Sequence, residues 1–325
     1  MHKTRKPWKW LLLAVCAWSC ACAAQAAEPY PARPIRLVVP YSPGGNTDVF
    51  ARLIAQRLTQ AWGQQVVVDN RAGGNTLIGT ELVARSIADG YTIMLTTLTF
   101  TVSPSLYKKL PYDTLKDFTP ITLAVKLPNV LVVHPSVPAK SLKELIQHAK
   151  ANPGKLNYAS TGSGTSPHLS MELLKTMAGI DLVNIPYKGG APAMADLMGG
   201  QISAQFIGLS VAIPHIKSGK LRALAVTSAK PSSVAPDIPP VGETVPGYEL
   251  DAWFGVFGPG GMPAPLVQRL QEEIAKILRS PDFKEHLVSL GAEPVGSTSR
   301  QFSAHIKSEI AKYAQIVKST GILAE

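Results

Sequence analysis

Two glycine-rich loops carry the side chains of this sequence that are best suited to ligand chemistry. The first reads YSPGGNTD from Tyr41 to Asp48, and the second reads ASTGSGTSPH from Ala159 to His168. Glycine lets backbone approach a ligand closely, and Asn, Ser and Thr add hydrogen-bond donors without charge. Each loop precedes a segment with helical periodicity, whose free N–H groups and dipole favour an anion. Both loops therefore predict anion binding.

Candidate ligand-binding residues come from these loops and from a few positions near other strand ends. In the first half of the chain they are Tyr41, Gly44, Gly45, Asn46, Thr47, Asp48, Asn75, Thr76 and Thr97. In the second half they are Ser160, Thr161, Gly162, Ser163, Thr165, Ser166, His168, Tyr187 and Phe206. Asn75 and Thr76 belong to a third loop, RAGGNT, and Phe206 is expected to form an aromatic wall.

Three of these residues allow more specific hypotheses. Asp48 suits a helix cap or a first-turn position as well as a ligand site. His168 can cap or pack near a helix start, or contact a ligand. We hypothesise that Thr47 and Thr165 act from opposite lobes on one bound ligand, because both lie in Gly-rich loops just before a predicted helix, where hydroxyl and amide donors converge.

Other kinds of site fit these patterns poorly. The first loop lacks the Lys of a phosphate loop and the third Gly of a dinucleotide fingerprint. The second loop is not a G-x-S-x-G elbow, because Ser163 lies directly between two glycines. Cysteine occurs only at positions 16, 20 and 22, and no two His residues have zinc-site spacing. The sequence thus predicts no catalytic residue, no metal and no cofactor. It favours a ligand-binding protein, and two alternatives stay open: a secreted enzyme acting on small carboxylates and a periplasmic ligand sensor.

The first 26 residues have the pattern of a secretory signal peptide. A basic start, MHKTRKPWKW, precedes an apolar run and an A-x-A cleavage signal at residues 24–26. Removing the four basic residues of this leader lowers the formal net charge from +10 to +6. A moderately basic surface favours anionic ligands, and the chain has no Lys/Arg cluster typical of nucleic-acid binding. We expect a cleaved, monomeric protein of the periplasm that binds no nucleic acid.

The elements that position the loops alternate between strand and helix. In the first half, strands are predicted at residues 34–41, 64–70 and 91–97 and helices at 48–61 and 80–88. After residue 134, helices are predicted at 141–154, 168–179 and 188–200 and strands at 155–160, 182–187, 202–208 and 221–228. Further along, a strand at 253–261 precedes helices at 263–280 and 300–319. This alternation is typical of mainly parallel sheets flanked by helices.

The pattern restarts halfway, so we predict two α/β lobes. Lobe one contains residues 27–123 plus 227–325, and lobe two contains residues 124–226. Two extended crossings between the lobes form a hinge, and the ligand cleft lies between the lobes at the carboxyl ends of the strands.

Several segments, taken in order, resemble the Bug family over essentially the whole mature chain. They are VPYSPGGNTDVFARLIAQRL, VDNRAGG, YASTGSGTSPHLS, IPYKGGAPAMADLMGGQI and AWFGVFGPGGMP. Members of this family are periplasmic substrate-binding proteins of tripartite tricarboxylate transporters. The resemblance implies a two-lobe periplasmic binding protein fold (a Venus flytrap, type II-like). It also implies a small organic carboxylate, held by backbone N–H groups, hydroxyls and waters from the two glycine loops, and delivery to integral-membrane permease subunits.

Overall fold

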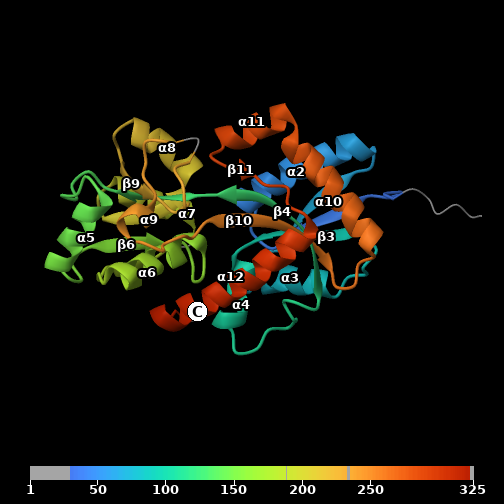
Figure 1. Cartoon of the computed structure of the whole chain (residues 1–325), viewed down its shortest axis with the longest axis horizontal. Helices are drawn as coiled ribbons and strands as arrows, with labels where there is room; N and C mark the ends of the chain where they lie inside the picture. Colours follow the sequence, from blue (N-terminus) through green and yellow to red (C-terminus); the bar gives the residue numbers. More distant parts are fainter. Residues whose placement is uncertain (1–29, 188, 233–234, 323–325) are drawn as a thin grey trace, which may run out of the picture.

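The computed structural model describes residues 30–187, 189–232 and 235–322. The predicted signal peptide, residues 1–26, lies outside the described residues. Figure 1 shows two α/β regions side by side along the long axis of the molecule. Each region is built on one sheet.

The first sheet has six strands in the order β11-β4-β10-β3-β1-β2. Their bounds are Ile35–Val39 (β1), Val66–Asn70 (β2), Thr92–Thr97 (β3), Phe118–Leu127 (β4), Ala252–Pro259 (β10) and Glu293–Pro294 (β11). Strand β1 is parallel to β2 and β3, whereas β10 is antiparallel to both β3 and β4. The helices of this region are Asn46–Trp62 (α2), Leu77–Ala84 (α3), Thr99–Leu106 (α4), Ala264–Arg279 (α10), Pro281–Ser289 (α11) and Ser299–Thr320 (α12).

The second sheet has five strands in the order β7-β6-β8-β5-β9. Their bounds are Asn129–Val133 (β5), Asn157–Ser160 (β6), Val183–Pro186 (β7), Ala204–Gly208 (β8) and Arg222–Val226 (β9). Strand β6 is parallel to β7 and β8, and β5 is antiparallel to β8 and β9. The helices are Leu142–Ala151 (α5), Ser166–Ala178 (α6), Gly190–Met198 (α7), Leu209–Lys217 (α8) and Val241–Thr244 (α9).

The predicted fold class and the order of the predicted strands and helices are confirmed, and the structure adds strands β4, β5 and β11 and helices α4, α8, α9 and α11. Helices α4 and α8 were not predicted, because each contains proline and β-branched residues, which disfavour helix. Packing against α12 stabilises helix α4, and its hydroxyls are satisfied within the helix, as when Ser103 Oγ donates to Thr99 O at 2.8 Å. The antiparallel strands β10 and β5 make both sheets mixed.

The two sheets join at the edge where the candidate residues lie. The chain passes between the sheets at Pro128, which separates β4 from β5. Strand β4 ends at the edge where Thr97 ends β3, since both strands pair with the start of β10. On the other side Asn129 pairs with Gly208, the last residue of β8. The carboxyl ends of the parallel strands in both sheets therefore meet at this crossing.

The return crossing lies beside the first one. The Thr227 amide donates to the Asn129 carbonyl, and the Asn129 amide donates to Thr227 Oγ1, both at 2.9 Å. Helix α12 packs against α4 and α6, so it contacts elements of both regions (Figure 1). Its start is fixed by a capping box in which Thr298 and Gln301 bond reciprocally.

Candidate ligand-binding site

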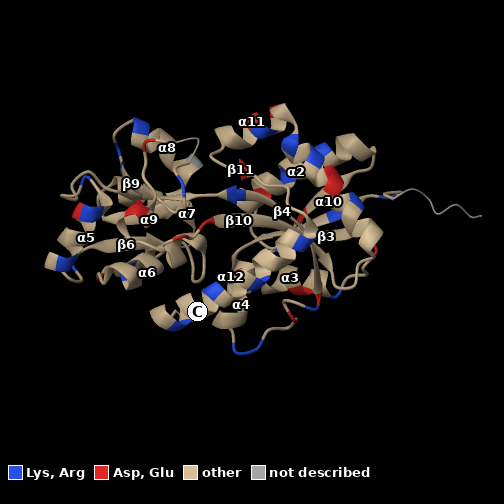
Figure 2. Ribbon diagram, in the orientation of Figure 1, with Lys and Arg blue, Asp and Glu red and all other residues tan. Residues whose placement is uncertain are grey.

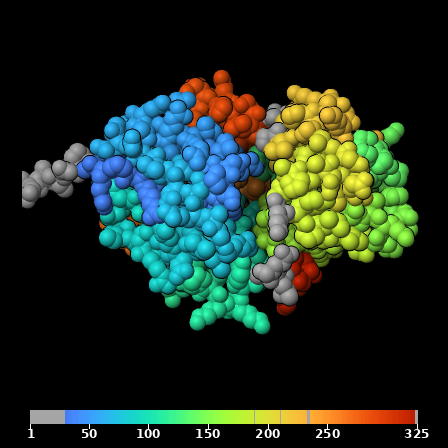
Figure 3. Space-filling view, turned by 180° about the vertical axis from the view of Figure 1, so that it is seen from behind, coloured from blue at the N-terminus to red at the C-terminus, as the bar shows by residue number. Residues whose placement is uncertain are grey.

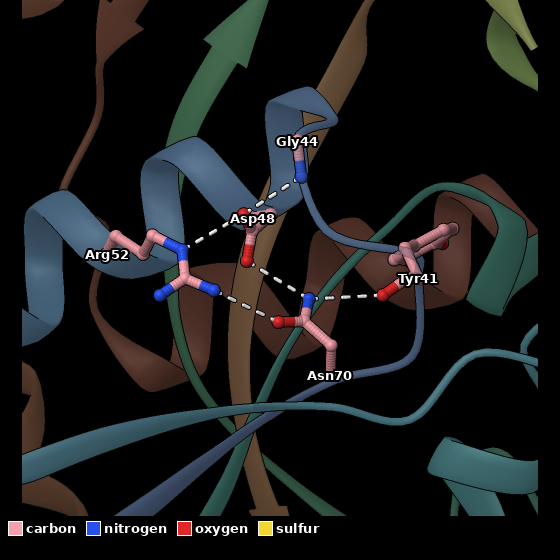
Figure 4. A network of polar contacts seen from close by, with 5 residues as sticks. All are labelled: Tyr41, Gly44, Asp48, Arg52 and Asn70. Atoms are coloured by element: carbon pink, nitrogen blue, oxygen red, sulfur yellow. Dashed lines mark hydrogen bonds and ion pairs between the residues drawn. The ribbon is translucent and has the colours of Figure 1, made fainter.

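The first glycine loop is held in shape by one buried carboxylate (Figure 4). Asp48 is 4% exposed, and its oxygens accept hydrogen bonds from the Gly44 amide, Arg52 Nε and Asn70 Nδ2, each at 3.0 Å. Asn70 Nδ2 also donates to the Tyr41 carbonyl at 3.1 Å. The end of β2 is thereby bound to both sides of the loop that follows β1.

This network decides what Asp48 contributes to the site. Burial alone would raise its pKa, but the hydrogen bonds from Arg52, Gly44 and Asn70 and the charge of Arg52 lower it. Asp48 is therefore ionised at neutral pH, with its charge engaged by protein donors. The structure assigns Asp48 to the support of the loop.

The N-terminus of α2 presents the donors of the first loop. The N-cap of α2 is Gly45, which has no side chain to cap the first-turn N–H groups. Asn46 follows it and is exposed in the first turn. The Thr47 side chain is 6% exposed, and its hydroxyl bonds to no group among the described residues. The first-turn N–H groups and the Thr47 hydroxyl are therefore available to an anion.

The third loop adopts an unusual backbone. Gly73, Gly74, Asn75 and Thr76 all have positive φ, and Thr76 at 79° is a β-branched residue in a region that such residues rarely enter. Thr76 is the N-cap of α3 and is 4% exposed, and its buried hydroxyl has no partner in the described part of the chain. The sequence motif RAGGNT predicted a loop here but gave no sign that the left-handed run extends past the two glycines.

Tyr41 lies over the end of β3. Its hydroxyl is 3.4 Å from Thr96 Oγ1. Burial raises the pKa of Tyr41, although hydrogen bonds with Thr96, Thr99 and the Thr97 backbone oppose the rise. The phenol is therefore a neutral donor at physiological pH, and Thr97, half-buried, lies at the same strand end.

The second loop is braced by its own hydroxyls. Thr165 Oγ1 donates to the Gly162 carbonyl at 2.8 Å and lies 3.4 Å from Thr161 Oγ1. The Gly164 amide donates to His168 Nδ1 at 3.3 Å, so this imidazole, which is 7% exposed, holds the loop. Ser163, Thr161 and the N-terminus of α6 remain partly exposed.

The remaining predicted residues of this half lie close by, with one exception. Ser160 ends β6, and its carbonyl accepts from the Tyr187 amide at 2.9 Å. The Tyr187 hydroxyl donates to Asp196 at 2.6 Å, and this bond is the main reason that its pKa rises to about 12. The expectation for Phe206 is corrected, because it is 0% exposed and stacks against Tyr248, with ring centroids 6.4 Å apart. Its side chain is part of the buried hydrophobic core.

Loops and helices of the two regions touch each other near the strand ends. A Cβ built on Gly164 would lie 2.6 Å from Leu106 Cδ1, and one built on Gly208 would lie 3.5 Å from Asn46 Nδ2. The second glycine loop therefore lies against α4, and the first lies near the end of β8. Figure 3 shows the surface hollowed between the region of residues 40–110, in blue and teal, and that of residues 130–220, in green and yellow.

Sequence reasoning missed the residues that support the loops. Arg52, Asn70 and Asn129 all bond to candidate residues. The one available signal was the placement of an amide side chain beside a strand end, as in VVVDN and NVLVV. Which donor each amide would meet depends on contacts between distant segments, which a sequence pattern does not contain.

Basic side chains and two surface grooves lie outside the glycine loops. Figure 2 shows Lys and Arg on helices of both regions, yet residues 41–47 and 160–167 contain neither. Two other grooves, of about 660 and 530 Å³, are lined by residues of α10 and α12 and of α5 and α9. None of the candidate residues lines either groove. Within the described ranges, no group of three or more His, Cys, Asp or Glu side chains could hold a metal ion.

Solved structures define the class of protein to which this fold and site belong. The protein titled "R. palustris Rpa4515 with adipate" has a TM-score of 0.83 and 38% sequence identity, covering 91% of this chain and 100% of that one. MatC (Rpa3494) from Rhodopseudomonas palustris with bound malate has a TM-score of 0.78 and 30% identity, covering 89% of this chain and 100% of that one. The periplasmic binding protein BugD has a TM-score of 0.79 and 36% identity, covering 91% of this chain and 100% of that one, so the fold is that of solute-binding proteins.

The family is shown by the sequence as a whole. Residues 50–322 match the model described as "Tripartite tricarboxylate transporter family receptor". BugT of Bordetella pertussis, strain Tohama I, is 39% identical over 302 residues, covering 92% of this chain and 93% of that protein. The chain belongs to the tripartite tricarboxylate transporter receptor family, and the resemblance to Bug proteins is confirmed. No helix among the described residues is long and apolar enough to cross a membrane.

Proposed function

We propose that this receptor captures a small organic carboxylate in the periplasm and delivers it to integral-membrane permease subunits of a tripartite tricarboxylate transporter. The observation that carries the proposal is the pair of glycine loops without Lys or Arg, each leading into a helix N-terminus, at strand ends that meet across the sheet crossing. An ionised carboxylate removed from water needs replacement hydrogen bonds, and amides and hydroxyls supply them without a buried counter-charge.

The ligand class follows from the same donors and from the relatives. The bound molecules named for the two similar structures, adipate and malate, are both dicarboxylates. We propose that the ligand here is a carboxylate of comparable size. We further propose that it is bound and released unchanged, since the site offers donors rather than an activated nucleophile, and that no cofactor takes part.

We also propose how binding becomes a signal. One lobe would contain residues 27–123 plus 227–325 and the other residues 124–226, with the ligand between them. The sheets modify these bounds at two places, because β4 lies in the first sheet as far as Leu127 and α9 packs against α5 of the second region. A ligand that contacts both lobes stabilises the closed form over the open form, and the permease recognises that difference. The predicted signal peptide supports a place in the periplasm.

Thermal denaturation of purified protein in the presence of carboxylates tests the function. A ligand at about 1,000 times its dissociation constant should add about 4 kcal/mol to the free energy of unfolding. Adipate, malate, a tricarboxylate, an aromatic acid and an acidic amino acid form the panel, with the neutral diamide of adipate as the control. If none of the acids raises the Tm, the proposal fails. If nuclear magnetic resonance shows an acid being converted, the protein is an enzyme instead.

A further inference from the structure

Asn129 stands where the two crossings and the second glycine loop meet. It is 3% exposed and is the first residue of β5, directly after the crossing at Pro128. Its backbone bonds to Thr227 in the return crossing, through both its amide and its carbonyl. Its side-chain amide, Nδ2, donates to Ser166 Oγ at 2.5 Å. One buried residue therefore connects the hinge to the first turn of α6.

This contact constrains what the Ser166 hydroxyl can do. A hydroxyl has one proton to donate and two lone pairs that accept. Because Ser166 Oγ accepts from Asn129, one of its lone pairs is used and its proton remains to be donated. Among the described residues, no acceptor takes that proton. The neighbouring Thr165 differs, since its proton is already donated to the Gly162 carbonyl.

We propose that Asn129 is a positioning residue that fixes Ser166 as the hydroxyl donor to the ligand carboxylate at the N-terminus of α6. The inference rests on the proposed function, because it assigns a role within the same site. Asn129 also bonds through its backbone to Thr227 in the return crossing. The orientation of the Ser166 hydroxyl therefore depends on how the two crossings, which form the hinge, are arranged. Of the two adjacent hydroxyls, that of Ser166 donates to the ligand and that of Thr165 donates to the loop backbone.

A double-mutant cycle on affinity tests the inference. The variants are Asn129→Ala, Ser166→Ala and the double mutant, and the probe is adipate, with malate as a second probe, measured by calorimetry. Ser166→Ala should raise Kd about tenfold to hundredfold, since a hydrogen bond to a charged group is lost. Asn129→Ala keeps the backbone bonds to Thr227 and should raise Kd severalfold. The double mutant should bind no more weakly than Ser166→Ala, because Asn129 acts through that hydroxyl.

Asn157→Ala is the matched control for a merely structural asparagine. Asn157 begins β6, at the other end of that strand from Ser160, and its side chain bonds to the Gln201 carbonyl and to Ser203. Its loss should lower the Tm and leave Kd unchanged. Asn129→Ala should instead change Kd beyond what its effect on Tm accounts for.

Each outcome has a distinct meaning. Unchanged affinity in Asn129→Ala, or losses that multiply in the double mutant, would overturn the inference while wild-type binding leaves the proposed function intact. If the unmodified protein binds neither adipate nor malate, nor any other acid of the panel, the proposed function fails and the inference falls with it. A double mutant equal to Ser166→Ala would establish the assignment.

Discussion

Gly164 and Leu106 meet where the second glycine loop lies against helix α4 of the other region. A Cβ built at Gly164 would lie 2.6 Å from Leu106 Cδ1 and 3.5 Å from Val102 Cγ1. Real Cβ atoms do not approach that closely, so the contact depends on the absence of a side chain. It is one of the places where the two regions touch beside the proposed ligand cleft.

Gly164→Ala should therefore weaken ligand binding by obstructing closure. The substitution adds a backbone cost at φ 73° and a clash with Leu106. Gly219→Ala is the control, because its φ is 72° and a Cβ there meets open space. Both should lose similar backbone stability, about 1 kcal/mol, but only Gly164→Ala should raise Kd and reduce ligand-induced compaction in small-angle scattering. Adding Leu106→Ala should recover part of the affinity, and equal Kd values for the two Gly variants would contradict this account.

Asp48→Asn should lower stability and loosen the first loop. The variant keeps the shape but turns one of the two acceptor oxygens into a donor. That new donor faces either Gly44 N and Arg52 Nε, which bond to Oδ2, or Asn70 Nδ2, which bonds to Oδ1, so about 1–3 kcal/mol is expected from the unsatisfied buried groups. Because the folded-state pKa of Asp48 is lowered, its contribution is present at neutral pH and is lost as pH falls below the ordinary value of 3.8. Urea denaturation at pH 7 measures the loss.

An exposed carboxylate provides the comparison for Asp48. Asp282 pairs with Arg57 at 2.5 Å on the surface, where its side chain is 60% exposed. Asp282→Asn should change stability little, since exposed ion pairs contribute little. A loss as large as that of Asp48→Asn would show that charge alone, and not the buried network, causes the effect.

Asp251 should make stability depend on pH near the crossings. Burial, with Glu249 and Glu293 nearby, raises its pKa to about 6 although Lys126 and Lys312 oppose the rise. The folded state therefore binds the proton more tightly than the unfolded state. This contribution to stability grows as pH falls from about 7 toward 4 and is absent above both pKa values.

Asp251→Asn tests that dependence. The variant should be more stable than the unmodified protein at pH 7.5 by up to about 3 kcal/mol. It should also show a flatter dependence of the free energy of unfolding on pH between 4 and 7. Identical pH profiles would mean that Asp251 titrates near its ordinary pKa, with the pair to Lys126 at 3.8 Å holding it ionised.

Thr47→Val and Thr165→Val should have different effects. The Thr47 hydroxyl has no partner among the described residues, so Thr47→Val should raise Kd about tenfold to hundredfold and leave the Tm of the free protein nearly unchanged. Thr165 donates to Gly162, so Thr165→Val should lower the Tm and affect Kd only through the loop. Measuring Tm and Kd on both variants decides whether they act alike, as the sequence hypothesis proposes, or separately.

Much of the fold could be predicted from the sequence because the boundaries between strands and helices are marked by clear changes of residue pattern. Apolar runs such as IRLVV alternate with segments of helical periodicity. The helix predicted from residue 141 does begin there, with Ser141 as the N-cap of α5, whose side chain accepts from the Glu144 amide. The sheet order could not be read this way. Strand β10 lies between β3 and β4, far from both in sequence, and nothing in a local pattern specifies such a partner.

At the site, the sequence predicted the loops but not the direction of each side chain. Phe206 illustrates the limit, because both faces of β8 are buried and the local sequence does not specify which neighbours cover each face. Thr165 and Ser166 illustrate it again, since two adjacent hydroxyls of the same chemistry have their hydrogen bonds set by different distant or local partners. Hydrogen-bond direction is a property of the assembled fold.

The place of β10 between β3 and β4 also determines the order in which the protein can be assembled. Until residues 252–259 are present, β3 and β4 each have an unpaired edge, and such edges invite association with other chains. The five-stranded sheet, by contrast, is made entirely from residues 129–226 and needs no later segment. If the chain folds from its N-terminus, the second sheet can therefore be completed first. The first sheet, although it contains the earliest strands β1 to β4, stays incomplete until β10 is available.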